Sequence, residues 1–151
     1  MLRLNKLTDY AVVILSHMAR QNLHSSTSVL AAETGLNEPT VAKVLKDLIK
    51  SGLVASTRGA NGGYTLNGDP KEISVRQVIE AIEGPIALAD CVDGHATGCA
   101  VQVCGTRGNW DQVNTAMIAA LENVKLIDMM LAPQKVPQPA PSKLVQIKEL
   151  T

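Results

Sequence analysis

The fold is decided by residues 26–66, which read STSVLAAETGLNEPTVAKVLKDLIKSGLVASTRGANGGYTL. Two helix signals flank a tight turn: Gly35 suits the left-handed end of one helix, and Asn37 suits the N-cap of the next. Pro39 falls in the first turn of the second helix, where its missing N–H costs nothing. This pattern predicts a helix-turn-helix. The second helix has an apolar face at helical spacing, formed by Val41, Val44, Leu45, Leu48 and Ile49.

Two short strands are predicted directly after this second helix. The apolar runs 53–55 and 64–66 flank the loop 58–63, Arg-Gly-Ala-Asn-Gly-Gly, and this arrangement indicates a β-hairpin. A helix-turn-helix followed by a hairpin is the order of elements in a winged helix, which places one helix in the major groove of DNA. The alternative is ordinary core packing with a solvated charged face, which is the commoner role of a single charged helix. The wing favours DNA binding over that alternative.

Further helices are predicted on both sides of this unit. Residues 7–21 have the apolar period of a first helix, and Ser74 begins a capping box for a helix that ends before Gly84. From residue 108 to residue 131 a heptad-like pattern predicts one long helix that pairs with a second copy of the chain. The positions of this seam are Trp110, Val113, Met117, Ala120, Val124, Ile127 and Leu131.

The predicted fold class is mainly α, a winged helix-turn-helix with a small β-hairpin wing and a long C-terminal dimerisation helix. We expect a DNA-binding domain over 1–69 and a linking helix with a cysteine loop over 70–104. The dimerisation helix follows over 105–131. The Pro-rich tail 132–151 has little to bury, and we expect it to be mobile.

Length and composition limit the class of protein. The chain has 151 residues, 46% of them hydrophobic, with no Phe, one Trp and two Tyr, which fits one compact unit with an aliphatic core and excludes a large multi-domain enzyme. No apolar run is long enough for a membrane span, and the N-terminus lacks a signal-peptide pattern, so we expect a cytoplasmic protein without membrane contact. The three histidines form no nucleophile-base motif, and we expect no enzymatic activity.

The distribution of charge matters more than its total. Lys plus Arg and Asp plus Glu number 14 each, and a net charge of zero by itself argues against DNA binding. Residues 1–69, however, carry seven basic and five acidic groups, whereas residues 70–104 carry two basic and five acidic groups. Residues 1–69, the predicted DNA-binding domain, which we call the reading head, are therefore modestly basic. Residues 70–104, which contain the cysteines, are acidic. The candidate DNA contacts in the reading head are Ser28, Glu38, Thr40, Lys43, Lys46, Lys50, Arg58, Gly59, Asn61 and Gly62.

Three cysteines, Cys91, Cys99 and Cys104, stand in one short stretch of the chain, with seven and then four residues between them. Three thiolates on a glycine-containing loop can converge on a soft metal centre, and they are one short of the four ligands that an iron–sulfur cluster usually takes. Zinc is chemically possible, although neither interval matches a CxxC pair. Unrelated cysteines, or a disulfide with one thiol left over, are the plain alternatives. The candidate fourth ligands are His95, Asp93, Asp90 and the remote Asp9.

Residues 1 to about 131 resemble the Rrf2 family of winged-helix regulators. The resemblance rests on Thr8-Asp9-Tyr10-Ala11, on the wing 58–66, on the segment 74–84 and on a three-cysteine loop before a long helix. It implies a homodimer crossed through the C-terminal helix, one iron–sulfur cluster per subunit, and operator binding that depends on the state of the cluster. Members of the family control cluster assembly or respond to nitric oxide or iron.

The resemblance also implies roles for individual residues. In some members a histidine stands three residues after the last cysteine, whereas this chain has Arg107, and the cysteine spacing is less even than in familiar members. In other members an aspartate of the first helix ligates the cluster across the dimer, and Asp9 matches it, with His95 as its rival. Asp9 has the alternative role of an acid that favours the dipole of its helix. The ligand cysteines would be Cys91, Cys99 and Cys104.

We therefore predict a dimeric regulator that binds a double-stranded DNA operator and one iron–sulfur cluster per subunit, 4Fe-4S in preference to 2Fe-2S. It would repress genes of iron–sulfur cluster assembly. A nitric-oxide-sensing or iron-responsive repressor with the same cluster is the alternative within this class. From another class, a redox protein or cluster carrier would use the cysteines but would give the winged helix no role.

Overall fold

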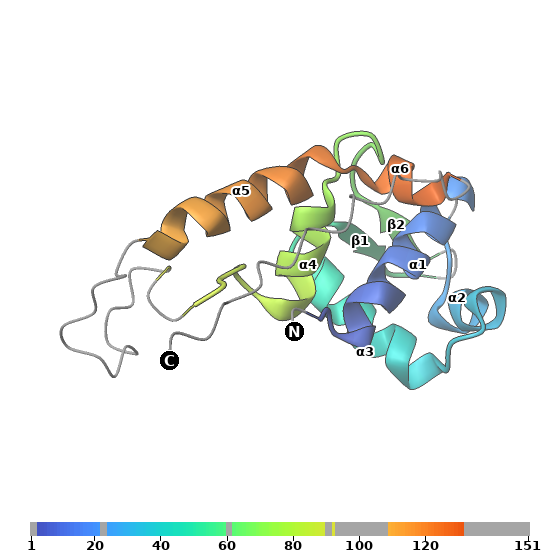
Figure 1. Ribbon diagram of the computed structural model, residues 1–151. Helices are drawn as coiled ribbons and strands as arrows, with labels where there is room; N and C mark the ends of the chain where they lie inside the picture. The colour runs from blue at the N-terminus through green and yellow to red at the C-terminus, as the bar shows by residue number, and fades with distance from the viewer. Residues whose placement is uncertain (1–2, 22–23, 60–61, 90–91, 93–108, 132–151) are drawn as a thin grey trace, which may run out of the picture.

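The computed structural model describes residues 3–21, 24–59, 62–89, 92 and 109–131. Figure 1 shows a body of short helices and one hairpin, with α5 extending from this body beside α4. The mainly helical architecture with a winged helix-turn-helix is confirmed. In chain order the elements are α1 (Lys6–Gln21), α2 (Thr27–Thr34), α3 (Glu38–Lys50), β1 (Val54–Thr57), β2 (Gly63–Leu66), α4 (Val75–Glu83), α5 (Asn109–Asn123) and α6 (Leu126–Met130).

The helix-turn-helix forms because residues at both helix starts supply the caps. The Ser26 hydroxyl accepts a hydrogen bond from the Val29 N–H at 3.2 Å, and Asn37 Oδ1 accepts one from the Thr40 N–H at 2.9 Å. Each cap satisfies a backbone donor that has no partner within its own helix. Between the helices Gly35 has a φ of 72°, a left-handed conformation that glycine adopts without a Cβ clash. The caps and the glycine together set the turn between α2 and α3.

The wing is an antiparallel hairpin that also pairs with the start of the helix-turn-helix. β1 and β2 align Val54 with Leu66 and Thr57 with Gly63. Beyond this pair, the Ser25 N–H donates to the Tyr64 carbonyl at 3.1 Å, and the Tyr64 N–H donates back to the Ser25 carbonyl at 2.9 Å. This isolated bridge attaches the hairpin to the segment that precedes α2.

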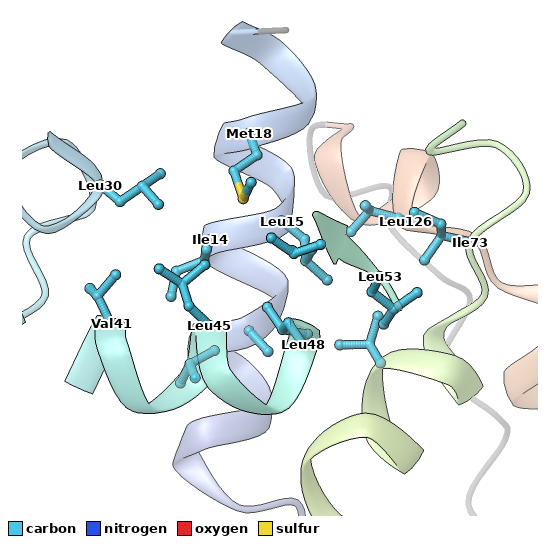
Figure 2. Close-up of a cluster of buried hydrophobic side chains, with 14 of the residues drawn as sticks. Ile14, Leu15, Met18, Leu30, Val41, Leu45, Leu48, Leu53, Ile73 and Leu126 are labelled. Atoms are coloured by element: carbon cyan, nitrogen blue, oxygen red, sulfur yellow. The ribbon is translucent and has the colours of Figure 1, made fainter. Parts of the chain in front are cut away.

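The core is aliphatic, as the absence of Phe requires. Figure 2 shows side chains from α1, α2 and α3 meeting each other and the side chains of Leu53, Ile73 and Leu126. Burying one such large aliphatic side chain stabilises a fold by roughly 1.5–3 kcal/mol. The winged helix and α6 therefore share one core. Its largest fully buried side chains include Ile14, Leu15, Met18, Leu30, Leu45, Leu48 and Leu126.

The sequence predicts one helix that runs to residue 131, but α5 ends at Asn123. Lys125 is extended, with φ −102° and ψ 159°, and it forms an isolated bridge with Ser74. The Val75 N–H donates to the Val124 carbonyl at 2.8 Å, and the Leu126 N–H donates to the Ile73 carbonyl at 2.8 Å. In these two hydrogen bonds the Val124 carbonyl and the Leu126 N–H have partners in a distant segment and not within a helix. The Leu126 side chain is thereby directed into the core. The prediction of one continuous helix was wrong because a pairing with a distant segment outweighs the local helical pattern.

The predicted seam is consequently divided. Trp110 and Val113 are 46% and 49% exposed on α5, where a partner could cover them. Val124 lies in the break, and Ile127 and Leu131 lie beyond it, so these three do not continue the seam. The seam positions that share one continuous helix are those on α5.

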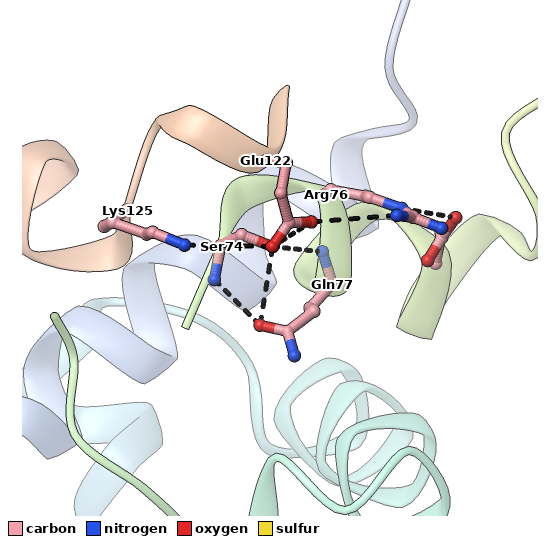
Figure 3. Close-up of polar contacts among 6 residues, drawn as sticks. Ser74, Arg76, Gln77, Glu122 and Lys125 are labelled. Carbon is pink, nitrogen blue, oxygen red and sulfur yellow. Dashed lines mark hydrogen bonds and ion pairs between the residues drawn. The ribbon is translucent and has the colours of Figure 1, made fainter. Parts of the chain in front are cut away.

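A polar cluster holds the break in place, as Figure 3 shows. The Ser74 hydroxyl donates to Glu122 Oε2 at 3.2 Å, and Arg76 Nη1 and Lys125 Nζ each lie 3.8 Å from an oxygen of the same carboxylate. Ser74 and Gln77 also form the predicted capping box at the start of α4. Glu122 thus joins the C-terminal end of α5 to the N-terminal end of α4.

No helix in the part of the chain that the structure describes is long and apolar enough to cross a membrane. Residues 105–108 of the predicted dimerisation helix and the predicted tail 132–151 lie outside the described residues. The expectation that the tail is mobile therefore stays a prediction.

Candidate nucleic-acid interface and the stem of the cysteine loop

α3 divides its side chains between the core and the solvent. Val41, Val44, Leu45 and Leu48 are buried against the rest of the winged helix. The opposite side is polar, and it is the side that a major groove could receive in a helix-turn-helix. The predicted residues on α3 all lie on this accessible side, with Thr40 half-buried and the others exposed: Glu38, Lys43, Lys46 and Lys50.

Three of these side chains form a basic stripe. Lys43, Lys46 and Lys50 are three and four residues apart, a spacing that aligns them along one face of a helix. Within the described part of the chain, the ion pairs lie between α1 and α2 and around α4 and α5, and none involves these lysines. Their charge is therefore available to phosphate groups.

The wing loop adds one further cation and a conformational requirement for glycine. Arg58 and Gly59 are exposed. The Gly62 N–H donates to the Gly59 carbonyl at 2.9 Å, and a Cβ at Gly62 would lie only 2.4 Å from the Thr57 carbonyl oxygen. Glycine is thus needed at position 62 for the loop to turn this tightly. Asn61, predicted as a DNA contact, lies outside the described residues.

A hollow of about 340 Å³ lies between the start of α2, the end of α3 and the wing. Ser28, a predicted contact, is exposed in the first turn of α2, and its hydroxyl lies 3.0 Å from that of Ser26. Hydroxyl groups and Arg58 around one concave surface suit an acidic sugar-phosphate backbone. The residues lining the hollow are Ser26, Thr27, Ile49, Ser56, Thr57, Arg58, Gly63 and Tyr64.

Most of these lining residues were not among the predicted contacts. The sequence shows the polar run 25–28 and the pair Ser56-Thr57. Residues 25–28 are also candidates for a helix N-cap, and Ser56-Thr57 is also typical of a strand. Neither pattern alone therefore predicts a binding surface. The bridge between Ser25 and Tyr64 brings the two runs together, and a pairing of this kind has no local sequence signal.

Asp9 lies in the first turn of α1 and is exposed, whereas its neighbour Thr8 is buried. The start of α1 is fixed to the end of α4 by one carboxylate. Glu83 Oε1 accepts from the Asn5 N–H at 2.9 Å and from the Thr8 hydroxyl at 2.5 Å. Asp9 is therefore held near the point where the chain leaves α4 toward the cysteines.

Residues 84–89 lead from the end of α4 toward Cys91, and we call them the stem. Asn114 of α5 binds the stem through both ends of its side-chain amide. Its Oδ1 accepts from the Leu88 N–H at 3.1 Å, and its Nδ2 donates to the Ile86 carbonyl at 3.2 Å. The stem thus lies against α5 at a fixed register.

An apolar hollow of about 340 Å³ lies between the N-terminal segment, the stem and α5. Ile79 and Leu88 line it together with Leu4, which is itself exposed. Met117 and Leu121 close it from α5. The stem, α5 and the residues before α1 therefore meet at one place.

The predicted ligands can be placed only in part. Cys91, Cys99 and Cys104 lie outside the described residues, and so do His95, Asp90 and Asp93. Among the described residues no group of three His, Cys, Asp or Glu side chains could hold a metal ion. Of the residues at or next to the predicted site, the structure describes Asp9 and the stem.

Comparison with known proteins agrees with this architecture. A family model described as "Rrf2: Iron-dependent Transcriptional regulator" matches residues 4–132. The HTH-type transcriptional regulator NsrR of Shouchella clausii is 28% identical over 133 residues, covering 86% of this chain and 89% of the relative. CymR (YrzC), the global cysteine regulator of B. subtilis, superposes with a TM-score of 0.67 at 25% identity, over 86% of this chain and 97% of that one. T. potens IscR gives a TM-score of 0.62 at 26% identity, over 88% and 94%.

Proposed function

The chain belongs to the Rrf2 family of DNA-binding transcriptional regulators, and from this premise we propose that it is a homodimeric repressor whose operator affinity depends on a bound iron–sulfur cluster. The family match covers the winged helix and the whole of α5 and α6. We assign its target genes to iron–sulfur cluster assembly. The observation that carries the DNA-binding part is the basic stripe of α3 beside the exposed wing.

The proposed contacts to DNA divide into two kinds. Thr40 and Lys43, on the exposed side of α3, would read base edges in the major groove. Lys50 and Arg58 would neutralise phosphates, and the hollow beside Arg58 would receive the backbone of one strand. The remaining contacts that we propose are Ser28, Glu38, Lys46, Gly59, Asn61 and Gly62.

The proposed cluster ligands are Cys91, Cys99 and Cys104, with Asp9 of the partner subunit as the fourth. Asp9 is supported by its exposure and by the Glu83 contacts that fix the start of α1. A carboxylate oxygen completes a set in which three thiolates are one ligand short. His95 is the rival fourth ligand. A bound 4Fe-4S cluster, or alternatively 2Fe-2S, would supply iron that reacts with oxidants or nitric oxide.

The proposed mechanism is a population shift between two arrangements of the dimer. When the cysteines of one subunit and Asp9 of the partner subunit are ligated, the stem of the first subunit and the start of α1 of the partner subunit would be held in one relative position. When they are not, this restraint is lost and the dimer samples a different spacing of its two α3 helices. Operator half-sites have a fixed separation, so the two arrangements bind DNA with different affinity.

The experiment that tests the cluster is anaerobic purification with iron and sulfide analysis and visible spectroscopy. We expect a coloured dimer that contains iron and sulfide. Cys99→Ser should abolish the colour, Asp9→Ala should shorten the lifetime of the cluster in air, and His95→Ala should match the wild type. A colourless protein without iron or sulfide after reconstitution would overturn the cluster assignment.

Two alternatives remain open to test. A nitric-oxide-sensing or iron-responsive repressor would use the same residues, and transcription assays with each signal distinguish these from a cluster-assembly regulator. A redox protein or cluster carrier would not retard any promoter fragment from the surrounding genes. Retardation of such a fragment by the dimer would exclude the carrier.

A further inference from the structure

Asn114 is a buried polar residue on a helix that is otherwise half-buried or exposed. Its side chain is 5% exposed, and it is the buried residue of α5. The amide uses one donor and one acceptor on backbone groups of residues 86 and 88, at 3.2 Å and 3.1 Å. It therefore pairs with the stem as a neighbouring strand would.

This contact joins the two parts of the molecule that must communicate in the proposed function. On one side, Leu88 precedes Cys91 by three residues. On the other side, Asn114 stands beside Val113, which belongs to the exposed face of α5. A displacement of Leu88 can reach α5 by this contact without passing through the core.

The stem is also held at its other end. Glu83 joins the last turn of α4 to the start of α1, immediately before the stem begins. The stem is thus restrained between α1 and α5, and the Asn114 amide is the restraint on the side of α5. Removing it would release the stem from α5 and leave the helix-turn-helix core untouched.

We propose that Asn114 is a positioning residue that transmits the state of the cysteine loop to α5. The inference rests on the proposed function, because it assumes that the cysteine loop has a ligated and an unligated state. Asn114→Asp keeps the shape of the side chain and an acceptor for the Leu88 N–H, but it cannot donate to the Ile86 carbonyl. Asn114→Ala removes both hydrogen bonds and leaves two backbone groups without their partner.

The first measurement uses the cluster-free full-length dimer and needs no cluster chemistry. Amide hydrogen exchange at Leu88 should accelerate by about tenfold or more in Asn114→Ala, which removes the acceptor of its N–H, because local opening sets the exchange rate. The acceleration should be smaller in Asn114→Asp, which keeps that acceptor and loses only the bond to the Ile86 carbonyl. Gln112→Ala is the matched control, since it removes an exposed amide from the other side of α5. Unchanged exchange at Leu88 in Asn114→Ala would overturn the proposal.

The second measurement compares operator affinity with and without the cluster. We expect wild type and Gln112→Ala to show a difference of about tenfold or more between the two forms. In the Asn114 variants this difference should fall below about threefold, while the cluster-free affinity stays that of the wild type. Native mass and melting temperature verify that each variant is a folded dimer, and Asn114→Asp serves if Asn114→Ala does not fold.

The outcomes separate the two hypotheses. If the wild type responds to its cluster and the Asn114 variants respond equally, transmission through Asn114 is wrong and the proposed function stands. If the wild type holds no cluster or shows no response, the proposed function fails and the transmitting role fails with it. If the Asn114 variants show a reduced response of operator affinity to the cluster together with faster exchange at Leu88, both the proposed function and the transmitting role of Asn114 are supported.

Discussion

Lys43 and Arg58 come from two different elements, α3 and the segment after β1, and both are exposed. Neither takes part in the ion pairs found among the described residues. A cation without a protein partner is stabilised most by an anionic ligand, and a DNA backbone supplies anions at regular intervals. These two residues are therefore the most direct probes of the proposed interface.

We predict that Lys43→Ala and Arg58→Ala each weaken operator binding by about 1–3 kcal/mol. A variant that loses a phosphate contact should also lower the slope of log affinity against log salt by about one. Fluorescence anisotropy over a salt series measures both quantities. Lys71→Ala is the control, because Lys71 is an exposed lysine outside both elements. Equal affinity of wild type and both variants would remove these residues from the interface.

Glu83 holds the start of α1 by accepting two hydrogen bonds, one from a backbone N–H and one from the buried Thr8 side chain. We predict that Glu83→Ala lowers the free energy of unfolding by about 1 kcal/mol. Glu83→Gln retains an acceptor oxygen and should lose less. Urea denaturation measures the change, with Glu72→Ala as an exposed control. An alanine variant as stable as wild type would contradict the role of Glu83 in fixing α1.

At the scale of elements, α6 belongs to the core of the winged helix although it follows α5 in the chain. Leu126 is 1% exposed and lies in the same cluster as Leu15 and Leu48. The Arg20 guanidinium also donates to the Met130 carbonyl at 3.0 Å, which joins the end of α1 to the end of α6. Unfolding of α6 should therefore be coupled to unfolding of the whole domain.

We predict that Leu126→Ala destabilises the protein by about 2–5 kcal/mol, the cost of a cavity in an aliphatic core. Leu131→Ala, five residues later and 53% exposed, should change stability by less than about 0.5 kcal/mol. Thermal and urea denaturation compare the two. A small effect at Leu126 would mean that α6 is detached from the core in solution.

The elements that could be predicted are those whose signals are local. Ser26 and Asn37 cap their own helices, Gly35 makes its own turn, and Ser74 with Gln77 forms a box within one helical turn. The break after α5 could not be predicted, because Lys125 pairs with Ser74, a partner far away in the chain. A heptad pattern reports only that a residue is apolar, not which surface buries it.

The same distinction applies to the candidate site. The accessible side of α3 follows from subtracting its buried face, so Lys43, Lys46 and Lys50 could be predicted from the sequence. The hollow beside the wing and the Asn114 contact depend on segments that only the tertiary fold brings together. The roles of the three cysteines stay a prediction, because they lie outside the described residues.

At the scale of the whole molecule, zero net charge limits what electrostatics alone can provide. A single reading head with a few cations gains little from counterion release. Two reading heads joined in one dimer engage both half-sites together, and the second contact is then intramolecular. The proposed function therefore depends on a dimer, and α5 carries two large apolar side chains, Trp110 and Val113, that are about half exposed.

We predict that the double variant Trp110→Glu with Val113→Glu dissociates the dimer. The two side chains are about half exposed and lie three residues apart on α5, the helix that extends from the body in Figure 1. Charges placed in an apolar interface cost more than the contacts they replace, so the dimer dissociation constant should rise by about thirtyfold or more.

Sedimentation over a concentration series measures this constant, and Gln112→Glu is the control because it adds a charge on the other side of α5. Operator affinity of the double variant should fall with dimerisation, while its melting temperature at low concentration should match that of dissociated wild type, because the winged-helix core does not include these residues. A double variant that remains dimeric would place the subunit interface on another surface. Dissociation without loss of operator affinity would instead contradict the argument that this nearly neutral reading head requires two copies to bind DNA.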